Sequence, residues 1–281
     1  MAARLSGVDP ILCAPLLRAV DGHLLALLRS LEPAEWALPT LAPGWQVRDV
    51  AGHLLDTALR KLSLVRDGWF SEPVEIRSSA DLAALVNRLN REGVAVYRRL
   101  SPDILISMME QATAASADWH ESLSPFAPAA LPVSWAGEER SLNWFDTARE
   151  LTERWHHQQQ IRIATGRPGL YLPELYHPVL DCFLRGLPFA LRDTPAEPGT
   201  TLAIEITGNC GGLWVLEHAD GKWNFRPEPA DADTARATVP QEIAWRIFTR
   251  GISRNEARAS VRLEGNRALA ESVLQLTAIV A

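Results

Sequence analysis

The sequence predicts an α+β protein in which an all-helical N-terminal part precedes a smaller part of mixed helices and strands. Between residues 9 and 193, apolar side chains recur at three- and four-residue steps, which is the period of a helix with one buried face. After Pro195 they alternate in short runs punctuated by Asn and Gly, as strands joined by tight turns do. We therefore expect a helical domain over residues 1–170 and an α+β domain over residues 171–281.

The helical stretches are delimited by their own stop signals. The first apolar stripe runs from Leu12 to Leu27, and the proline-rich segment LEPAEWALPTLAPGW that follows cannot continue a helix. Three prolines likewise make residues 124–138 a loop, with room for a short extended piece. We predict helices at residues 9–31, 46–68, 79–100, 102–123, 141–165 and 173–193, the last of which links the two domains.

The α+β domain is read from short alternating runs. We predict strands at residues 201–207, 213–219, 223–228, 235–239 and 259–265, with helices at 240–250 and 266–279. Asp220-Gly221 lies between two of these runs, and this dipeptide tolerates the positive φ angles of a two-residue hairpin turn. The sequence therefore predicts a β-hairpin there.

Composition excludes several classes of protein. The 281 residues suffice for two modest domains whose cores need no disulfide bonds. The net charge is −6 and no run of Lys or Arg stands out, so we expect no nucleic-acid partner. No apolar stretch is long enough to span a bilayer, and the N-terminus lacks the apolar core of a signal peptide, so we expect a cytoplasmic protein without a membrane partner.

Cys13, Cys182 and Cys210 are scattered and should be buried hydrophobic residues.

The segment at residues 141–165 carries two stripes at helical spacing. One is apolar and one is polar; the polar stripe consists of Asp146, Arg149, Glu153, His157 and Gln160. A solvated helix face is the ordinary explanation of such a stripe. However, Glu153 and His157 are four residues apart, so they lie one turn apart on nearly the same line of the helix. One carboxylate and one imidazole in that arrangement can reach the same metal ion.

A third ligand for such an ion would come from another helix. His53 is the candidate, at the edge of the apolar stripe of residues 46–68, beside Asp49 and Asp56. Three protein ligands leave an open position for water or substrate, as catalytic zinc sites require. Taken alone, a histidine in this position is more often an ordinary residue at the boundary of the core.

Two segments then resemble a known family. LAPGWQVRDVAGHLLD (41–56) resembles the Pro-Gly-Trp-x-Val-x-Asp-x-x-x-His signature of the mycothiol-dependent maleylpyruvate isomerases, part of the DinB-like bundle group. RELTERWHHQQQIRIATGRPG (149–169) resembles the Glu-x-x-x-His helix of that family. Residues 207–216 and 243–266 resemble its small C-terminal domain.

The resemblance implies a DinB-like four-helix bundle followed by a small α+β domain. It also implies a divalent metal, usually taken as zinc, held by His53, Glu153 and His157, and mycothiol or another low-molecular-weight thiol as cosubstrate. In the named isomerase the thiol adds to a cis double bond, the bond rotates and the thiol leaves. We therefore expect a thiol-utilising isomerase or S-transferase that acts on a small, carboxylated electrophile. Arg246 and Arg250 are candidates for binding substrate carboxylates, although an amphipathic helix also carries arginines merely as surface residues.

This sequence departs from the family pattern at two positions. Gln46 stands where the family often has Ser or Thr as a helix cap. Gln160 stands where it often has Asp, and Gln cannot supply a carboxylate to orient a ligand. Two His and one carboxylate suit several divalent ions, and the sequence leaves the oligomeric state open. A metal-dependent hydrolase and a non-catalytic, stress-response bundle with a vestigial metal site are the alternative functions.

Overall fold

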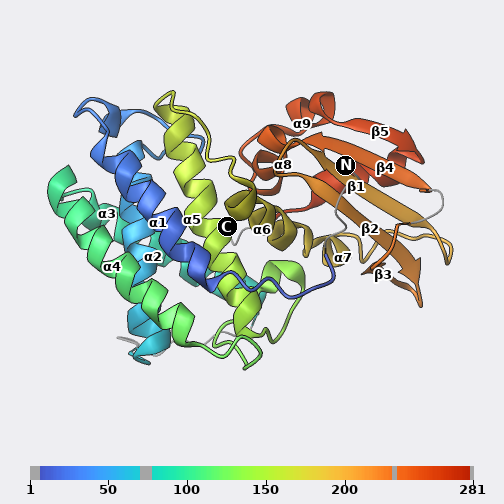
Figure 1. Cartoon of the computed structure of the whole chain (residues 1–281), viewed down its shortest axis with the longest axis horizontal. Coiled ribbons are helices and arrows are strands. Elements are labelled where there is room, and N and C mark those ends of the chain that lie inside the picture. Colours follow the sequence, from blue (N-terminus) through green and yellow to red (C-terminus); the bar gives the residue numbers. More distant parts are fainter. Residues whose placement is uncertain (1–6, 70–77, 230–232, 279–281) are drawn as a thin grey trace. The chain divides into compact units, whose positions relative to one another are not determined.

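The computed structural model describes residues 7–69, 78–229 and 233–278 (Figure 1). The chain forms two compact units. The helical unit contains Cys13–Ala130 and Leu142–Leu170, and the sheet unit contains Leu131–Ser141 and Tyr171–Ile279. Helices precede a mixed sheet along the chain, which confirms the predicted α+β class. No helix in the described part of the chain is long and apolar enough to cross a membrane.

The helical unit is a bundle of long helices: α1 (Ala14–Arg29), α2 (Val47–Lys61), α3 (Ser79–Tyr97), α4 (Pro102–Ser122) and α5 (Asn143–Ala164). Helix α1 packs against α4 and α5, α2 also packs against α4 and α5, and α3 packs on α2. Leu28, Val50, Leu55, Met109 and Ile161 lie in its buried core. These contacts arise because α1, α2, α4 and α5 bury the apolar residues of one face, whereas α3 buries mainly Val94.

Helix α2 begins where the sequence predicts it, but its regular part ends before the predicted residue 68. Gln46 occupies the cap position despite lacking a hydroxyl, and its backbone N–H donates to the Asp49 carboxylate over 3.0 Å. The same carboxylate accepts two hydrogen bonds of 2.8 Å from Arg98. The aspartate of the sequence signature thus fixes the start of α2. The α-helix ends at Lys61, and Leu62–Arg66 continue as a π-helical turn.

The sheet unit contains strands β1 (Thr201–Thr207), β2 (Gly212–Ala219), β3 (Lys222–Phe225), β4 (Ala235–Pro240) and β5 (Arg262–Gly265). Their order is β3-β2-β1-β4-β5, and of these pairs only β1 with β4 is parallel. The Asp220-Gly221 hairpin is confirmed, because these two residues join antiparallel β2 and β3 with φ angles of 52° and 72°.

The remaining elements of the sheet unit are short helices: α6 (Pro173–Leu184), α7 (Leu187–Ala190), α8 (Gln241–Phe248), α9 (Arg254–Ser260) and α10 (Arg267–Glu271). The single predicted helix at 173–193 is wrong in detail, since it breaks between α6 and α7. The predicted strand at 259–265 begins only at Arg262, because α9 occupies the residues before it. Ser253 and Glu256 form a capping box at the start of α9, and this signal is visible in the sequence. All three cysteines are buried, as predicted.

Candidate metal centre

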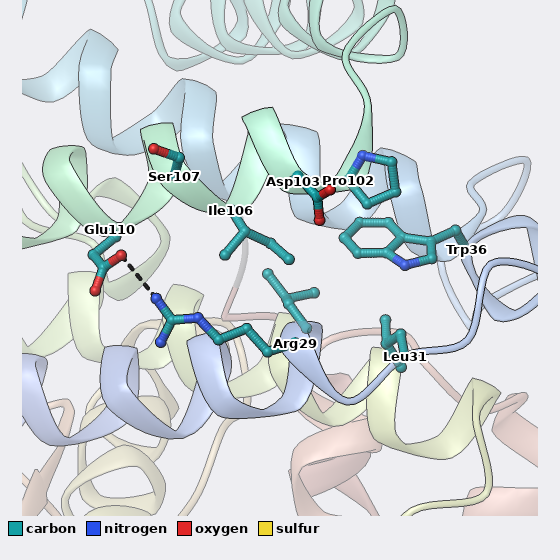
Figure 2. Close-up of a pocket in the computed structure, with 9 residues that line it drawn as sticks. Arg29, Leu31, Trp36, Pro102, Asp103, Ile106, Ser107 and Glu110 are labelled. Atoms are coloured by element: carbon teal, nitrogen blue, oxygen red, sulfur yellow. Dashed lines mark hydrogen bonds and ion pairs between the residues drawn. The ribbon is translucent and has the colours of Figure 1, made fainter.

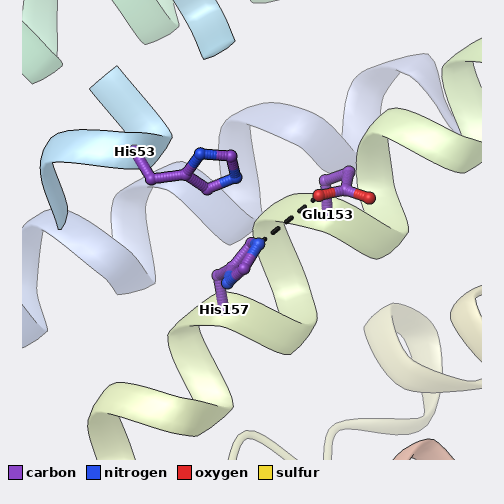
Figure 3. A group of neighbouring side chains, drawn as sticks. All are labelled: His53, Glu153 and His157. Atoms are coloured by element: carbon purple, nitrogen blue, oxygen red, sulfur yellow. Dashed lines mark ion pairs between the residues drawn. The ribbon is translucent and has the colours of Figure 1, made fainter. Parts of the chain in front are cut away.

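Two helices of the helical unit bring the candidate ligands together. His53 lies on α2, and Glu153 and His157 lie one turn apart on α5. Figure 3 shows the three side chains converging from these two helices. One potential ligand atom from each residue lies within 4.8 Å of the others. His157 Nε2 and Glu153 Oε2 are 3.5 Å apart.

The spacing and chemistry of this set suit a divalent ion. Two ligand atoms at 2.0–2.1 Å from a tetrahedral zinc ion lie about 3.4 Å apart. The 3.5 Å between His157 and Glu153 already meets this spacing. The widest separation in the set, at most 4.8 Å, needs to close by about 1.4 Å, which side-chain rotation can supply. Two imidazoles and one carboxylate are a common ligand set for such an ion.

The protonation states also suit a metal. Burial, and then the proximity of His157, lower the pKa of His53 well below its usual range, so this imidazole is neutral at physiological pH. Burial raises the pKa of Glu153, but the close approach of His157 and the nearby His156 and Arg149 outweigh it, so the pKa is lowered overall. Neutral imidazole and ionised carboxylate are the forms that bind metals.

Gln160 orients His157 from one turn further along α5. Its Oε1 lies 2.9 Å from His157 Nδ1. An amide oxygen only accepts hydrogen bonds, so Nδ1 of His157 donates to it, and Nε2 is the ring nitrogen that faces Glu153 and is left for a metal ion. The absence of a carboxylate at this position therefore does not remove the hydrogen bond that fixes the ring.

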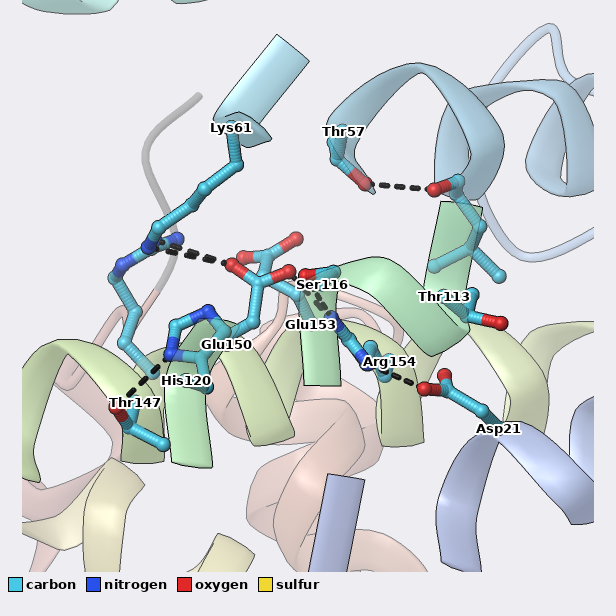
Figure 4. A network of polar contacts seen from close by, with 12 residues as sticks. Asp21, Thr57, Lys61, Thr113, Ser116, His120, Thr147, Glu150, Glu153 and Arg154 are labelled. Atoms are coloured by element: carbon cyan, nitrogen blue, oxygen red, sulfur yellow. Dashed lines mark hydrogen bonds and ion pairs between the residues drawn. The ribbon is translucent and has the colours of Figure 1, made fainter. Parts of the chain in front are cut away.

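A network of buried charges lies beside the candidate ligands (Figure 4). Its cations are Lys61, Arg149 and Arg154, and its carboxylates are Asp21, Asp146 and Glu150. Lys61 donates to both oxygens of Asp146 over 2.9 and 2.8 Å, and Arg154 pairs with Asp21 and donates to Ser116. Three cations thus balance three carboxylates.

Glu153 is a fourth carboxylate of this region, and it is not one of the three that pair with Lys or Arg. Among the described residues the His157 imidazole is the group within ion-pair distance of Glu153, at 3.5 Å, and Arg149 acts on Glu153 electrostatically without forming an ion pair with it. Its side chain is about four-fifths buried, and a carboxylate removed from water is costly unless it is paired or bound to a metal. Glu153 is thus the carboxylate of this region that is available to a cation.

The structure overturns the solvated interpretation of the polar stripe. Asp146, His157 and Gln160 are buried, and so are Glu150 and Arg154, which the stripe did not include. Sequence reasoning missed Lys61, Glu150, Arg154 and Asp21 as network members. Glu150 and Arg154 are four residues apart on the flank between the two stripes, and this spacing is the signal that could have revealed them.

The two candidate arginines belong to the sheet unit, whereas the three candidate metal ligands belong to the helical unit. Arg246 is on α8 and donates from Nε to the carbonyl oxygen of Gly251 over 3.2 Å, and Arg250 is exposed just after α8 with a φ of 56°. A shallow pocket of about 340 Å³ lies between α1 and α4 (Figure 2). Arg29 and Glu110 form an ion pair of 2.7 Å there, and Trp36 contributes to the lining.

The fold and this site define a helical bundle with a converging His-Glu-His set, joined to a small α+β unit. Residues 17–162 match the family model of the mycothiol maleylpyruvate isomerase N-terminal domain. Two uncharacterized proteins of Mycobacterium tuberculosis, from strains CDC 1551 and H37Rv, are each 31% identical over 216 residues, or 73% of this chain and 76% of each relative. The chain therefore belongs to the mycothiol maleylpyruvate isomerase family.

Solved structures agree in fold. A crystal structure of the mycothiol-dependent maleylpyruvate isomerase matches this chain with a TM-score of 0.55 at 15% identity, covering 89% of this chain and 91% of that one. A variant of that enzyme, with a histidine replaced by alanine, matches with the same TM-score at 14% identity. At this identity the likeness establishes the shared fold.

Proposed function

We propose that this protein is a metal-dependent enzyme that uses a low-molecular-weight thiol, of the isomerase or S-transferase type, and acts on a small carboxylated electrophile. The observation that carries the proposal is the convergence of His53, Glu153 and His157 from α2 and α5. Family membership supports the thiol, because the family is named for a mycothiol-dependent isomerase.

The charge balance of the bundle supports the metal. The Lys and Arg side chains of the neighbouring network are paired with Asp21, Asp146 and Glu150, whereas Glu153 adds a further, largely buried carboxylate beside His53 and His157. A divalent cation bound by Glu153 would offset this charge, which forms no ion pair with a Lys or Arg among the described residues. A zinc ion held by three protein ligands lowers the pKa of a thiol or water molecule at its open position.

The residues of the chain have separate tasks in this proposal. His53, Glu153 and His157 hold the ion, and Gln160 keeps the Nε2 lone pair of His157 directed into the site. Arg246 and Arg250 bind carboxylate groups of the substrate, for which guanidinium groups are well suited. Replacement of Arg246 or Arg250 by Gln should then raise KM for carboxylated substrates while metal content stays unchanged.

Elemental analysis of the purified protein, prepared without chelator, tests the metal. We expect about one divalent ion per chain, and loss of that ion in Glu153→Ala, because the remaining two imidazoles cannot hold it. Glu110→Ala is the matched control, since Glu110 is an exposed carboxylate that pairs with Arg29 in the same bundle. Full metal occupancy in Glu153→Ala would reject the assignment.

Calorimetry with mycothiol tests the thiol. We expect binding to the metal-loaded protein and none to the metal-free protein, because the thiol is proposed to bind through the ion. Equal affinity for both forms would contradict the proposal. Turnover of esters or amides without added thiol would instead identify a metal-dependent hydrolase. A protein that takes up no divalent ion at all would be the non-catalytic bundle.

A further inference from the structure

The two imidazoles of the candidate centre are oriented by different means. Histidines that bind metals almost always donate the proton of their other ring nitrogen to a nearby acceptor, which fixes the ring. His157 has such a partner in Gln160. His53 Nδ1 is buried and has no hydrogen-bond partner within the described residues. Something other than a hydrogen bond must therefore restrain the ring of His53.

Trp45 supplies a ring contact at this place. Its indole lies 5.0 Å from the His53 ring, centroid to centroid, at an interplanar angle of 54°. It lies 6.4 Å from the His157 ring at 23°. The two imidazoles are themselves 4.7 Å apart at 70°. Each of these distances is within the range of direct aromatic packing, so His53 is held between an indole and an imidazole.

The backbone of Trp45 is fixed at the start of α2. The N–H and the hydroxyl of Thr40 each lie 3.0 Å from the carbonyl oxygen of Trp45, and both donate to it. The N–H of Trp45 donates to the carbonyl oxygen of Ala42 over 3.0 Å. Gly44 has a φ of 78°, a value that glycine adopts without strain. This tight turn places the indole back along α2, over the ring of His53.

The indole N–H of Trp45 does not set the position of its ring. The indoles of Trp155, Trp214 and Trp223 each donate to an acceptor in the protein, as buried indoles usually do. For Trp45 no acceptor exists in the part of the chain that the structure describes, and its side chain is half-buried at the edge of the core. Ring contacts and the turn therefore determine where the indole lies.

We propose that Trp45 is a positioning residue of the metal centre, which holds the His53 imidazole by ring packing where His157 is held by a hydrogen bond. The proposal rests on the proposed function, because it assigns Trp45 a task toward the ion that His53 would bind. Packing requires a flat ring at this place, whereas the identity of the ring is secondary. We therefore expect Phe at position 45 to hold the His53 ring and preserve metal binding, whereas Leu or Ala should not.

Cobalt(II) binding to the metal-free protein tests the proposal without any enzyme assay. Affinity is measured by competition with a chromophoric chelator, and the ligand-field absorption of bound cobalt reports the coordination. We expect Trp45→Ala and Trp45→Leu to bind cobalt about tenfold or more weakly, with an altered absorption band, in line with the loss of other groups that orient ligands. Trp45→Phe should restore both.

Two further variants serve as a positive and a negative control for the cobalt-binding measurement. Gln160→Leu removes the hydrogen bond that orients the other imidazole and should weaken cobalt binding to a similar degree. Trp36→Phe alters a tryptophan of the same bundle that lies in the pocket between α1 and α4, and it should leave binding unchanged. If Trp45→Ala does not fold, the comparison of Trp45→Leu with Trp45→Phe decides the question.

The outcomes separate this inference from the function on which it rests. If the unaltered protein binds no cobalt, the proposed metal centre is wrong and the role of Trp45 falls with it. If it binds cobalt, and folded Trp45→Ala or Trp45→Leu binds with the same affinity and the same spectrum, only the role of Trp45 is wrong.

Discussion

Asp21 makes the stability of the helical unit depend on pH in a way that can be calculated. Its carboxyl group is buried in α1 against Arg154 and Glu150. Burial raises its pKa from 3.8 to about 6, although the positive charge of Arg154 opposes this. A difference of one pKa unit corresponds to about 1.36 kcal/mol. The difference between the unfolded and folded pKa of Asp21 therefore corresponds to about 3 kcal/mol of folding free energy.

The sign follows from which state holds the proton. Between pH 3.8 and about 6 the folded protein keeps Asp21 protonated while the unfolded chain has released the proton. The contribution of protonated Asp21 to the stability of the folded state is therefore complete below pH 3.8, and it is lost as the pH rises to about 6. Glu150 acts in the opposite sense: burial raises its pKa, but Lys61 and Arg154 outweigh this and lower it to about 2. The stabilisation by Glu150 is lost as the pH falls below 4.5.

The variant Asp21→Asn isolates the effect, because Asn does not titrate. The free energy of unfolding of both metal-free proteins is measured with denaturant at pH values from about 7 to about 4.5. Over this range we expect the wild-type protein to gain about 2 kcal/mol relative to Asp21→Asn, while the Glu150 contribution cancels in the difference. A difference that does not change with pH would refute the assignment of a raised pKa to Asp21.

Two further predictions concern the packing of the helical unit. Lys61→Met should lower the free energy of unfolding by roughly 3 kcal/mol, because it leaves Asp146 with Arg149 as its remaining cation, and denaturant titration beside a Lys61→Arg control measures this. Gly93→Ala should cost about 1–3 kcal/mol in the same assay, since a Cβ at Gly93 would lie 2.4 Å from the carboxyl carbon of Asp56. Unchanged stability in either variant would contradict the packing described for that residue.

Local sequence signals predicted the elements that depend on local geometry. The strand at 201–207 was predicted with the bounds that the structure gives, and the Asp220-Gly221 hairpin follows from two residues that accept positive φ. The ends of helices were less certain from the sequence. The break between α6 and α7 falls at Gly186, with Pro188 two residues further on, a signal that the single predicted helix at 173–193 did not take into account. The π-helical turn Leu62–Arg66 contains no proline or glycine, so the end of α2 has no comparable signal.

The polar stripe of α5 shows where sequence reasoning reached its limit. A helix face that meets water and a helix face that meets charges from other helices have the same periodicity. Lys61 from α2 and Asp21 from α1 provide the charges that make burial of this face tolerable. Neither residue is near α5 in the sequence, so no local pattern could distinguish the two cases.

The sequence by itself determined most of the helices and strands, apart from the break within 173–193 and the helical residues before Arg262. It also determined that Glu153 and His157 face the same side of one helix, because the helical period is a property of the local backbone. Only the tertiary structure decided that His53 reaches them from α2, that Trp45 packs over His53, and that every neighbouring carboxylate except Glu153 has a Lys or Arg partner. His53, Lys61 and Asp21 are far from α5 in the chain, so their contacts with it depend on how whole helices pack. Trp45 is close to His53 in the chain, and their ring contact depends on the turn that precedes α2.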